Sequence, residues 1–73
     1  MSEYTDNTAN ELANLALAEA AASDNTKIVE QIGEILGASS QTLEEAYLTA
    51  VRVRRAEKRA RELLAKYAAA RGA

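Results

Sequence analysis

The 73-residue sequence contains no cysteine, histidine, proline, tryptophan or phenylalanine. Without cysteine the chain forms no disulfide, and without cysteine or histidine it has no ordinary zinc site. It also has no run of about 18 apolar residues, the length that a membrane-spanning helix requires. Its start, MSEYTDNTANE, is acidic and polar, unlike a secretory signal peptide. We therefore expect a protein of the cytoplasm or of a virus-like assembly, neither secreted nor bound to a membrane.

The sequence also lacks the side chains that most catalysis requires. It has no nucleophile paired with a base and no glycine-rich phosphate loop. The adjacent carboxylates Glu44 and Glu45 would point in different directions on a helix. We predict that the protein is not an enzyme and has no catalytic residue, no cofactor, no metal and no small-molecule substrate.

The chain is poor in side chains that could fill a core. A domain this short buries only about 60% of the surface that its unfolded chain exposes. Much of its apolar content is alanine, which contributes little buried area. Such a domain is marginally stable alone, so we expect a partner chain or a larger assembly to supply part of its stability.

The charge is distributed unevenly along the chain. Residues 1–45 contain nine acidic residues and one lysine, whereas residues 46–73 contain eight basic and two acidic residues. An asymmetry of this size suggests an electrostatic partner for each half. The two halves of neighbouring copies could serve as those partners, with acidic N-terminal helices facing basic third helices.

The pattern of apolar residues and breaks predicts an all-α fold of three helices, at about 8–22, 26–36 and 42–70. The second is the clearest, with Ile28, Ile32, Ile35 and Leu36 on one side. Residues 1–7 are predicted to be a flexible acidic segment, with Tyr4 able to pin it to another surface. Residues 8–73 would form a single helical domain, a helical corner followed by a long basic amphipathic helix.

Four signals predict where these helices begin and end. Thr8 with Glu11, and Thr42 with Glu45, match the S/T-x-x-E capping box. Asp24 or Asn25 would cap the second helix, and Gly37 would end it in a left-handed conformation.

The third helix is too long for the other two to cover. About 28 residues make a rod of roughly 40 Å, whereas a compact domain of this length is roughly 30 Å across. Its far end should therefore project or pack on something else. There, apolar residues recur at steps of three and four, which predicts a narrow seam for a partner helix. We define the seam as Val53, Ala56, Ala60, Leu63, Leu64, Tyr67 and Ala70.

Basic residues occupy most of the rest of this helix. They could neutralise nucleic-acid phosphates, or they could form a solvated face or dock on the acidic half of a neighbouring subunit. No aromatic residue interleaves with the arginines to stack on bases, and Glu57 and Glu62 lie within pairing distance of Arg61, Lys58 and Lys66. The candidate contacts to nucleic acid or to an acidic partner are Arg52, Arg54, Arg55, Lys58, Arg59, Arg61 and Lys66.

The stretch IVEQIGEILGASSQTLEEA, residues 28–46, combines small and apolar residues at the spacing of a helical corner. Gly33 would let two helices approach, Gly37 would supply the turn, and Leu43 would lock the second helix onto the first. The residues that carry the pattern are Ile32, Gly33, Leu36, Gly37, Ala38, Ser39, Thr42, Leu43 and Ala46.

This stretch resembles the helix-turn-helix of DNA-binding proteins, and the arginine-rich continuation looks like the tail of sigma-factor-type domains of that kind. The resemblance covers about a quarter of the chain. It implies that Ser40 and Gln41 reach the groove and hydrogen-bond to bases. Glu44 and Glu45 depart from the pattern because they would repel phosphates. An ordinary helix–helix corner would carry the same glycine and the same caps.

Two functional hypotheses follow. The first is a small structural or interaction protein of a helical bundle, which forms a homo-oligomer or docks into a multi-subunit assembly, such as a phage particle, through the seam. The second is a nucleic-acid-binding regulator that uses the corner and the basic helix. Neither needs a membrane.

Overall fold

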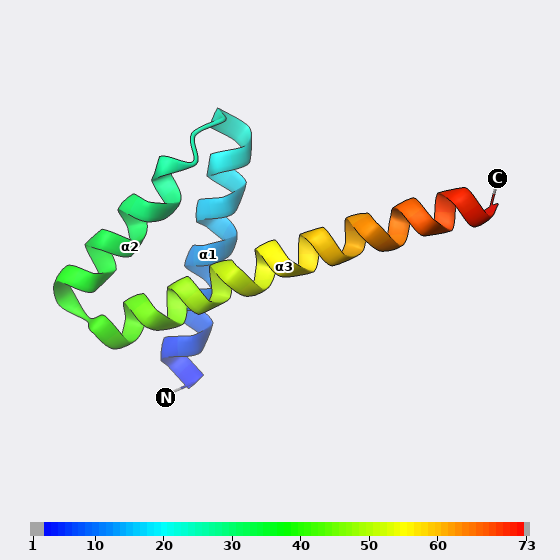
Figure 1. Ribbon diagram of the computed structural model, residues 1–73. Helices are drawn as coiled ribbons and strands as arrows, with labels where there is room; N and C mark the ends of the chain where they lie inside the picture. The colour runs from blue at the N-terminus through cyan, green and yellow to red at the C-terminus, as the bar shows by residue number, and fades with distance from the viewer. Residues whose placement is uncertain (1–2, 73) are drawn as a thin grey trace.

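The computed structural model describes residues 3–72, and within that range the chain forms three α-helices and no strand. These are α1 (Glu3–Ser23), α2 (Lys27–Ser39) and α3 (Gln41–Gly72). The predicted all-α fold of three helices is therefore confirmed. The three helices contact one another in pairs, but only the first half of α3 takes part (Figure 1).

The molecule has a compact part and a projecting part, which we call the head (residues 3–52) and the arm (residues 53–72). The head holds α1, α2 and the start of α3, whereas the arm continues α3 away from the other two helices (Figure 1). The radius of gyration is 14.9 Å and the longest extent is 51 Å. A compact chain of this length would have a radius of gyration of about 11 Å. The predicted projection of the third helix is confirmed.

Helix α1 begins five residues earlier than the sequence signals predicted. It starts at Glu3, so Thr8 lies inside the helix and the predicted capping box with Glu11 is wrong. Glu3 and Asp6 lie in the first turn, where a negative charge is stabilised by the helix dipole. Residues 3–7 of the predicted flexible segment are therefore helical, and Met1 and Ser2 lie outside the described residues.

A left-handed residue ends α1, and this residue is Asp24 rather than a glycine. Its φ is 54°, and the Asn25 amide donates to the Ala20 carbonyl at 3.1 Å. This is the six-to-one hydrogen bond of a Schellman motif. The Asn25 side-chain oxygen then accepts from the Lys27 amide at 3.1 Å, at the start of α2. Thr26 occupies the N-cap position without a side-chain cap hydrogen bond, so Asn25 contributes from one residue further back.

The corner between α2 and α3 consists of the single residue Ser40, and the predicted turn at Gly37 is wrong. Helix α2 continues through Gly37 to Ser39, and no glycine of residues 3–72 has a positive φ. The Ser40 amide donates to the Leu36 carbonyl at 2.7 Å, and its hydroxyl oxygen accepts from the Leu43 amide at 3.1 Å. Ser40 therefore caps both helices, and this replaces the predicted capping box of Thr42 and Glu45.

The core of the head is built from alanine. Four alanines of α1 belong to the same buried cluster as Ala46 and Ala50 of α3, and small side chains allow helices to pack closely. Each contributes little apolar area, so this core is weakly stabilised for its size. The predicted stripe of α2 is rotated, because Val29 is buried whereas Ile35 is 65% exposed. The buried apolar residues are Ala9, Ala13, Ala16, Ala20, Val29, Ala46, Tyr47, Ala50 and Val51.

Tyr47 is the one large side chain that is fully buried among the described residues. Its hydroxyl donates to the Val29 carbonyl of α2 at 2.7 Å. Burial raises the pKa of Tyr47, and the nearby positive charge of Arg55 opposes part of that rise. A Cβ built on Gly33 would lie 3.5 Å from the Tyr47 ring, an ordinary contact distance. Gly33 therefore lies where α2 meets α3, as predicted, but the packing does not require it to be glycine.

Candidate functional site

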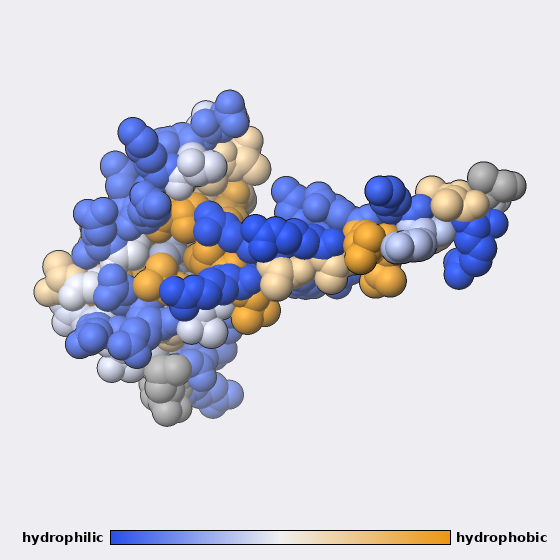
Figure 2. Space-filling view, in the orientation of Figure 1, coloured by the Kyte–Doolittle hydropathy of each residue, from blue (hydrophilic) through white to orange (hydrophobic). Residues whose placement is uncertain are grey.

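The seam is uncovered along the whole arm. Every residue from 55 to 72 is exposed, and no described residue of the head reaches over them. Leu63 is 55% exposed, and Leu64 and Tyr67 are each 69% exposed. In the space-filling view, orange and beige hydrophobic groups recur along the projecting helix between blue hydrophilic ones (Figure 2). The structure therefore leaves the predicted seam as a free apolar surface.

Helix α3 uses different sides for the core and for the seam. Residues of an α-helix follow one another at about 100° around its axis. On that basis the seam is centred roughly 130° away from the buried side of α3, which carries Ala46, Tyr47, Ala50 and Val51. The head packs on one side of α3, and the seam faces another direction, so the same head cannot cover both.

The exposed area agrees with this view. The chain has 5589 Å² of accessible surface. A compact monomer of 7.8 kDa would expose about 4,400 Å². The excess of roughly 1,200 Å² on one chain is larger than the area of about 800 Å² that each partner buries in a standard interface.

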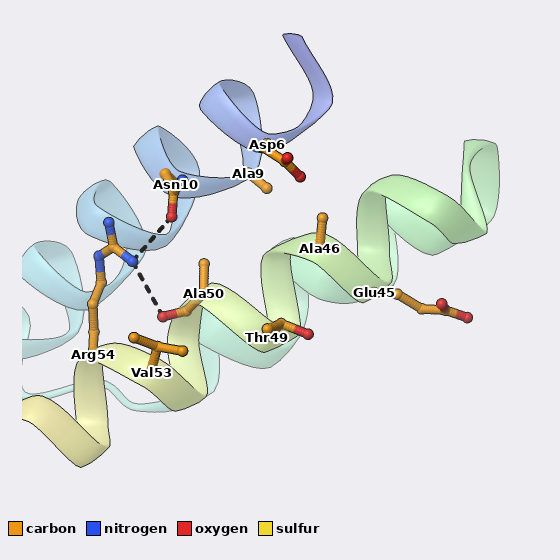
Figure 3. A pocket seen from close by; sticks show the side chains of 9 residues that line it. All are labelled: Asp6, Ala9, Asn10, Glu45, Ala46, Thr49, Ala50, Val53 and Arg54. Atoms are coloured by element: carbon orange, nitrogen blue, oxygen red, sulfur yellow. Dashed lines mark hydrogen bonds between the residues drawn. The ribbon is translucent and has the colours of Figure 1, made fainter. Parts of the chain in front are cut away.

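A shallow groove of about 390 Å³ lies where α1 crosses α3, at the base of the arm. Asp6 and Asn10 of α1 lie on one side of it, and α3 forms the other side (Figure 3). Val53, the first residue of the seam, belongs to its lining, so the groove and the seam form one continuous surface. The lining residues are Asp6, Ala9, Asn10, Glu45, Ala46, Thr49, Ala50, Val53 and Arg54.

Arg54 is occupied within the protein rather than free for a partner. Its guanidinium donates to the side-chain oxygens of Asn14 and Asn10 of α1, the second at 3.2 Å. A third hydrogen bond runs to the Ala50 carbonyl at 3.3 Å (Figure 3). Arg54 thus fixes the base of the arm to α1, and its use as a phosphate or partner contact would require these bonds to break.

Most of the other predicted basic contacts are exposed. Arg61 pairs with Glu57 one turn earlier, at 2.8 Å, as the spacing predicted. The remaining five, which form no ion pair with another residue of the range 3–72, are Arg52, Arg55, Lys58, Arg59 and Lys66. The arm therefore combines an apolar seam with a basic surround.

The predicted groove contacts of the helix-turn-helix do not form such a motif here. A helix-turn-helix has a turn of three to four residues, whereas Ser40 alone separates α2 from α3. The Ser40 hydroxyl oxygen is engaged in capping α3, and Gln41 is the exposed first residue of that helix. Glu44 lies over Gly37, the position that the resemblance assigned to the turn.

A second exposed apolar surface lies on α1, and the sequence interpretation missed it. Tyr4 is 80% exposed and Leu15 is 61% exposed. The sequence carried the signal, a regular spacing of three and four, but Tyr4 was assigned to a flexible segment. We define the outer face of α1 as Tyr4, Thr8, Glu11, Leu15, Ala18 and Ala22, of which Thr8 is half-buried and the others are exposed.

Other kinds of site are not apparent in the part of the chain that the structure describes. Residues 3–72 hold no group of three or more Asp or Glu side chains arranged to bind a metal ion. None of the three helices, within the same range, has the length and apolarity to cross a membrane.

Comparisons with protein-family models, with curated proteins and with solved structures gave no match to this chain.

Proposed function

We propose that the protein is a small non-enzymatic interaction subunit, which self-associates or docks into a larger multi-subunit assembly through the seam of its arm. The observation that carries this proposal is the uncovered seam, in which Leu63, Leu64 and Tyr67 are each more than half exposed. A partner helix would bury these side chains, at about 25 cal/mol per Å² of apolar surface. A phage particle is one assembly of this kind.

The alanines support helix packing in particular. Ala56 and Ala60 lie between the larger side chains of the seam, and Ala70 follows Tyr67 at its end. Small residues at such positions let two helix backbones approach closely, while Leu63 and Tyr67 fill the space beside them. Exposed apolar surface of this regularity is typical of an interaction site rather than of a free monomer surface.

Sedimentation velocity tests the proposal. The wild-type chain should associate at micromolar concentrations, and the double variant L63S/L64S should be monomeric. Both side chains are exposed, so the variant should keep the helical circular dichroism of the wild type. The variant I35S is the matched control, because Ile35 is exposed to a similar degree but lies on α2. A wild-type chain that remains monomeric would contradict self-association and leave docking on a different protein. An L63S/L64S variant that associates equally well would contradict the use of the seam.

A second candidate function is nucleic-acid binding through the basic side chains of α3. It is favoured by the exposed Arg and Lys side chains without an ion pair in residues 3–72. Fluorescence anisotropy with a random-sequence duplex, at low and at physiological salt, tests it. Binding that weakens steeply with salt would show contacts to phosphates. An absence of binding at low salt would leave the positive charge for an acidic protein partner.

A further inference from the structure

The arm and the outer face of α1 have matching dimensions. The arm has 20 residues and α1 has 21, so each is a helix of about 30 Å. Tyr4, Leu15 and the alanines of the outer face follow steps of three and four over most of α1. The seam follows the same steps over most of the arm. Two helices with this spacing can pack side by side along their whole length.

Their charges are opposite. Helix α1 carries four carboxylates and no Lys or Arg, and the arm carries seven basic and two acidic residues. Glu11 lies within the outer face, and Glu19 is exposed beside it. Pairing two arms would instead bring together two helices of net charge +5, as the same counts give. Like charges at a contact disfavour association, whereas opposite charges favour it and select the partner.

Within one chain, these two surfaces cannot meet. The arm leaves the head as a straight continuation of α3 and extends away from α1 (Figure 1). Most of the outer face of α1 is also turned away from α3, because Ala9, Ala13, Ala16 and Ala20 face the core. Of its six residues, Ala18 borders a hollow that Arg55 and Lys58 of the arm also line. The contact must therefore join two different chains.

Resting on the proposed function, we infer that the occupant of the seam is a second copy of this chain, whose α1 outer face packs against it. The contact joins two different surfaces, the arm of one copy and α1 of the next, and is therefore heterologous. Tyr4 and Leu15 would be buried against the seam, and Glu11 and Glu19 would lie near the arginines that surround it.

Complementation between two defective variants tests the inference. The variant L63S/L64S lacks the seam but keeps the outer face of α1. The variant Y4S/L15S lacks the outer face but keeps the seam. Each should be monomeric alone in sedimentation velocity, and an equimolar mixture should form a one-to-one heterodimer, because one intact contact remains. The I35S variant should associate as the wild type does.

The possible results separate this inference from the proposed function. If L63S/L64S is monomeric but Y4S/L15S associates like the wild type, the arm binds something other than α1. The inference is then overturned, and association through the seam stands. If the wild-type chain is itself monomeric, both the contact between the arm and α1 and self-association through the seam are overturned. Circular dichroism of each variant checks that it is folded, since all four side chains are exposed.

The charges give a second, independent measurement. The double variant E11K/E19K keeps every apolar side chain of the outer face but reverses two charges of α1. This variant should associate more weakly than the wild type. Added salt should weaken the association of E11K/E19K less than it weakens the association of the wild type. Association of E11K/E19K that equals the wild type at low salt would contradict the inference, because an arm–arm contact does not involve Glu11 or Glu19.

Discussion

Tyr47 and Tyr67 lie on the same helix, but one is in the head and the other is on the arm. Tyr47 is fully buried and its hydroxyl is hydrogen-bonded to α2, whereas Tyr67 is 69% exposed. The same residue type in the same secondary structure thus has opposite environments. The difference arises from what packs against each half of α3: two helices cover the first half, and no described residue covers the second. The head holds the buried core, and the arm leaves its apolar side chains exposed.

Replacing each tyrosine by alanine should give the largest contrast. Tyr47→Ala leaves a cavity in a core made mostly of alanine, at a cost of about 3–5 kcal/mol in the free energy of unfolding. That is comparable to the whole stability of a small domain, so the head should be largely unfolded. Tyr67→Ala should change the stability of the monomer by less than about 0.5 kcal/mol. Urea titration followed by circular dichroism, on dilute protein, measures both. Equal costs would show that the arm is covered in the monomer.

Replacing an alanine by leucine in the head and in the arm should give a smaller difference in stability between the two variants. Ala13 is completely buried where α1 meets α3, so Ala13→Leu should cost about 1–3 kcal/mol by pushing the helices apart. Ala60 is exposed on the arm, and Ala60→Leu should leave the free energy of unfolding within about 0.5 kcal/mol of the wild type. The melting temperature of dilute samples gives the comparison. An Ala13→Leu protein as stable as the wild type would mean that the alanine interface is loosely packed.

Removing the Tyr47 hydroxyl should cost about 1 kcal/mol, because the hydrogen bond to the Val29 carbonyl is lost. The Tyr47→Phe variant should also change the pH dependence of stability. Burial raises the pKa of Tyr47 above its ordinary value of 10.0, against the opposing charge of Arg55. Below that pH the Tyr47 hydroxyl is protonated in both the folded and the unfolded chain, and its full contribution to the free energy of unfolding is present.

Above pH 10, the unfolded chain loses the proton before the folded chain does, so the free energy of unfolding falls as the pH rises. Tyr47→Phe should remove this part of the fall, and denaturant titrations between pH 9 and about 11 would detect it. The control is Tyr67→Phe, which alters an exposed ring and should leave the alkaline decrease unchanged. An identical decrease in Tyr47→Phe and the wild type would show that Tyr47 ionises as readily when folded as when unfolded.

Single substitutions at two backbone positions near the helix ends should have the smallest effect on the free energy of unfolding. Gly37 lies inside α2, so Gly37→Ala should stabilise the head by about 0.5–1 kcal/mol. Its new Cβ would come 2.7 Å from the flexible Glu44 carboxylate, which must move aside. Asp24 has a left-handed backbone, and Asp24→Gly should gain up to about 1 kcal/mol. Gly72→Ala at the end of the arm, with no neighbour within 4 Å, is the control. Thermal melts would rank the three, and destabilisation by Gly37→Ala would mean that Glu44 cannot move.

Much of the architecture could be predicted from the sequence because it depends on local rules. The spacing of apolar residues indicated three helices, and the uninterrupted run after Thr42 indicated a helix longer than the head. The helix ends were less predictable. A glycine and two S/T-x-x-E patterns competed with Asp24 and Ser40, which the packing of the head selected instead. Capping signals are short and recur by chance, so the neighbouring helices decide which of them is used.

Some properties of the candidate surfaces also followed from the sequence, and others depended on the tertiary structure. The composition determined that the core would be small and rich in alanine, and the distribution of charge determined an acidic α1 and a basic α3. Spacing alone placed the seam on one side of the third helix. Only the tertiary structure decided that the Arg54 guanidinium is hydrogen-bonded to Asn10 and Asn14. It also decided that Tyr47, rather than a leucine, fills the centre of the core, and that the side chains of Tyr4 and Leu15 stay exposed. The physical reason is that a sequence defines the faces of each helix, whereas burial depends on which faces the other helices reach.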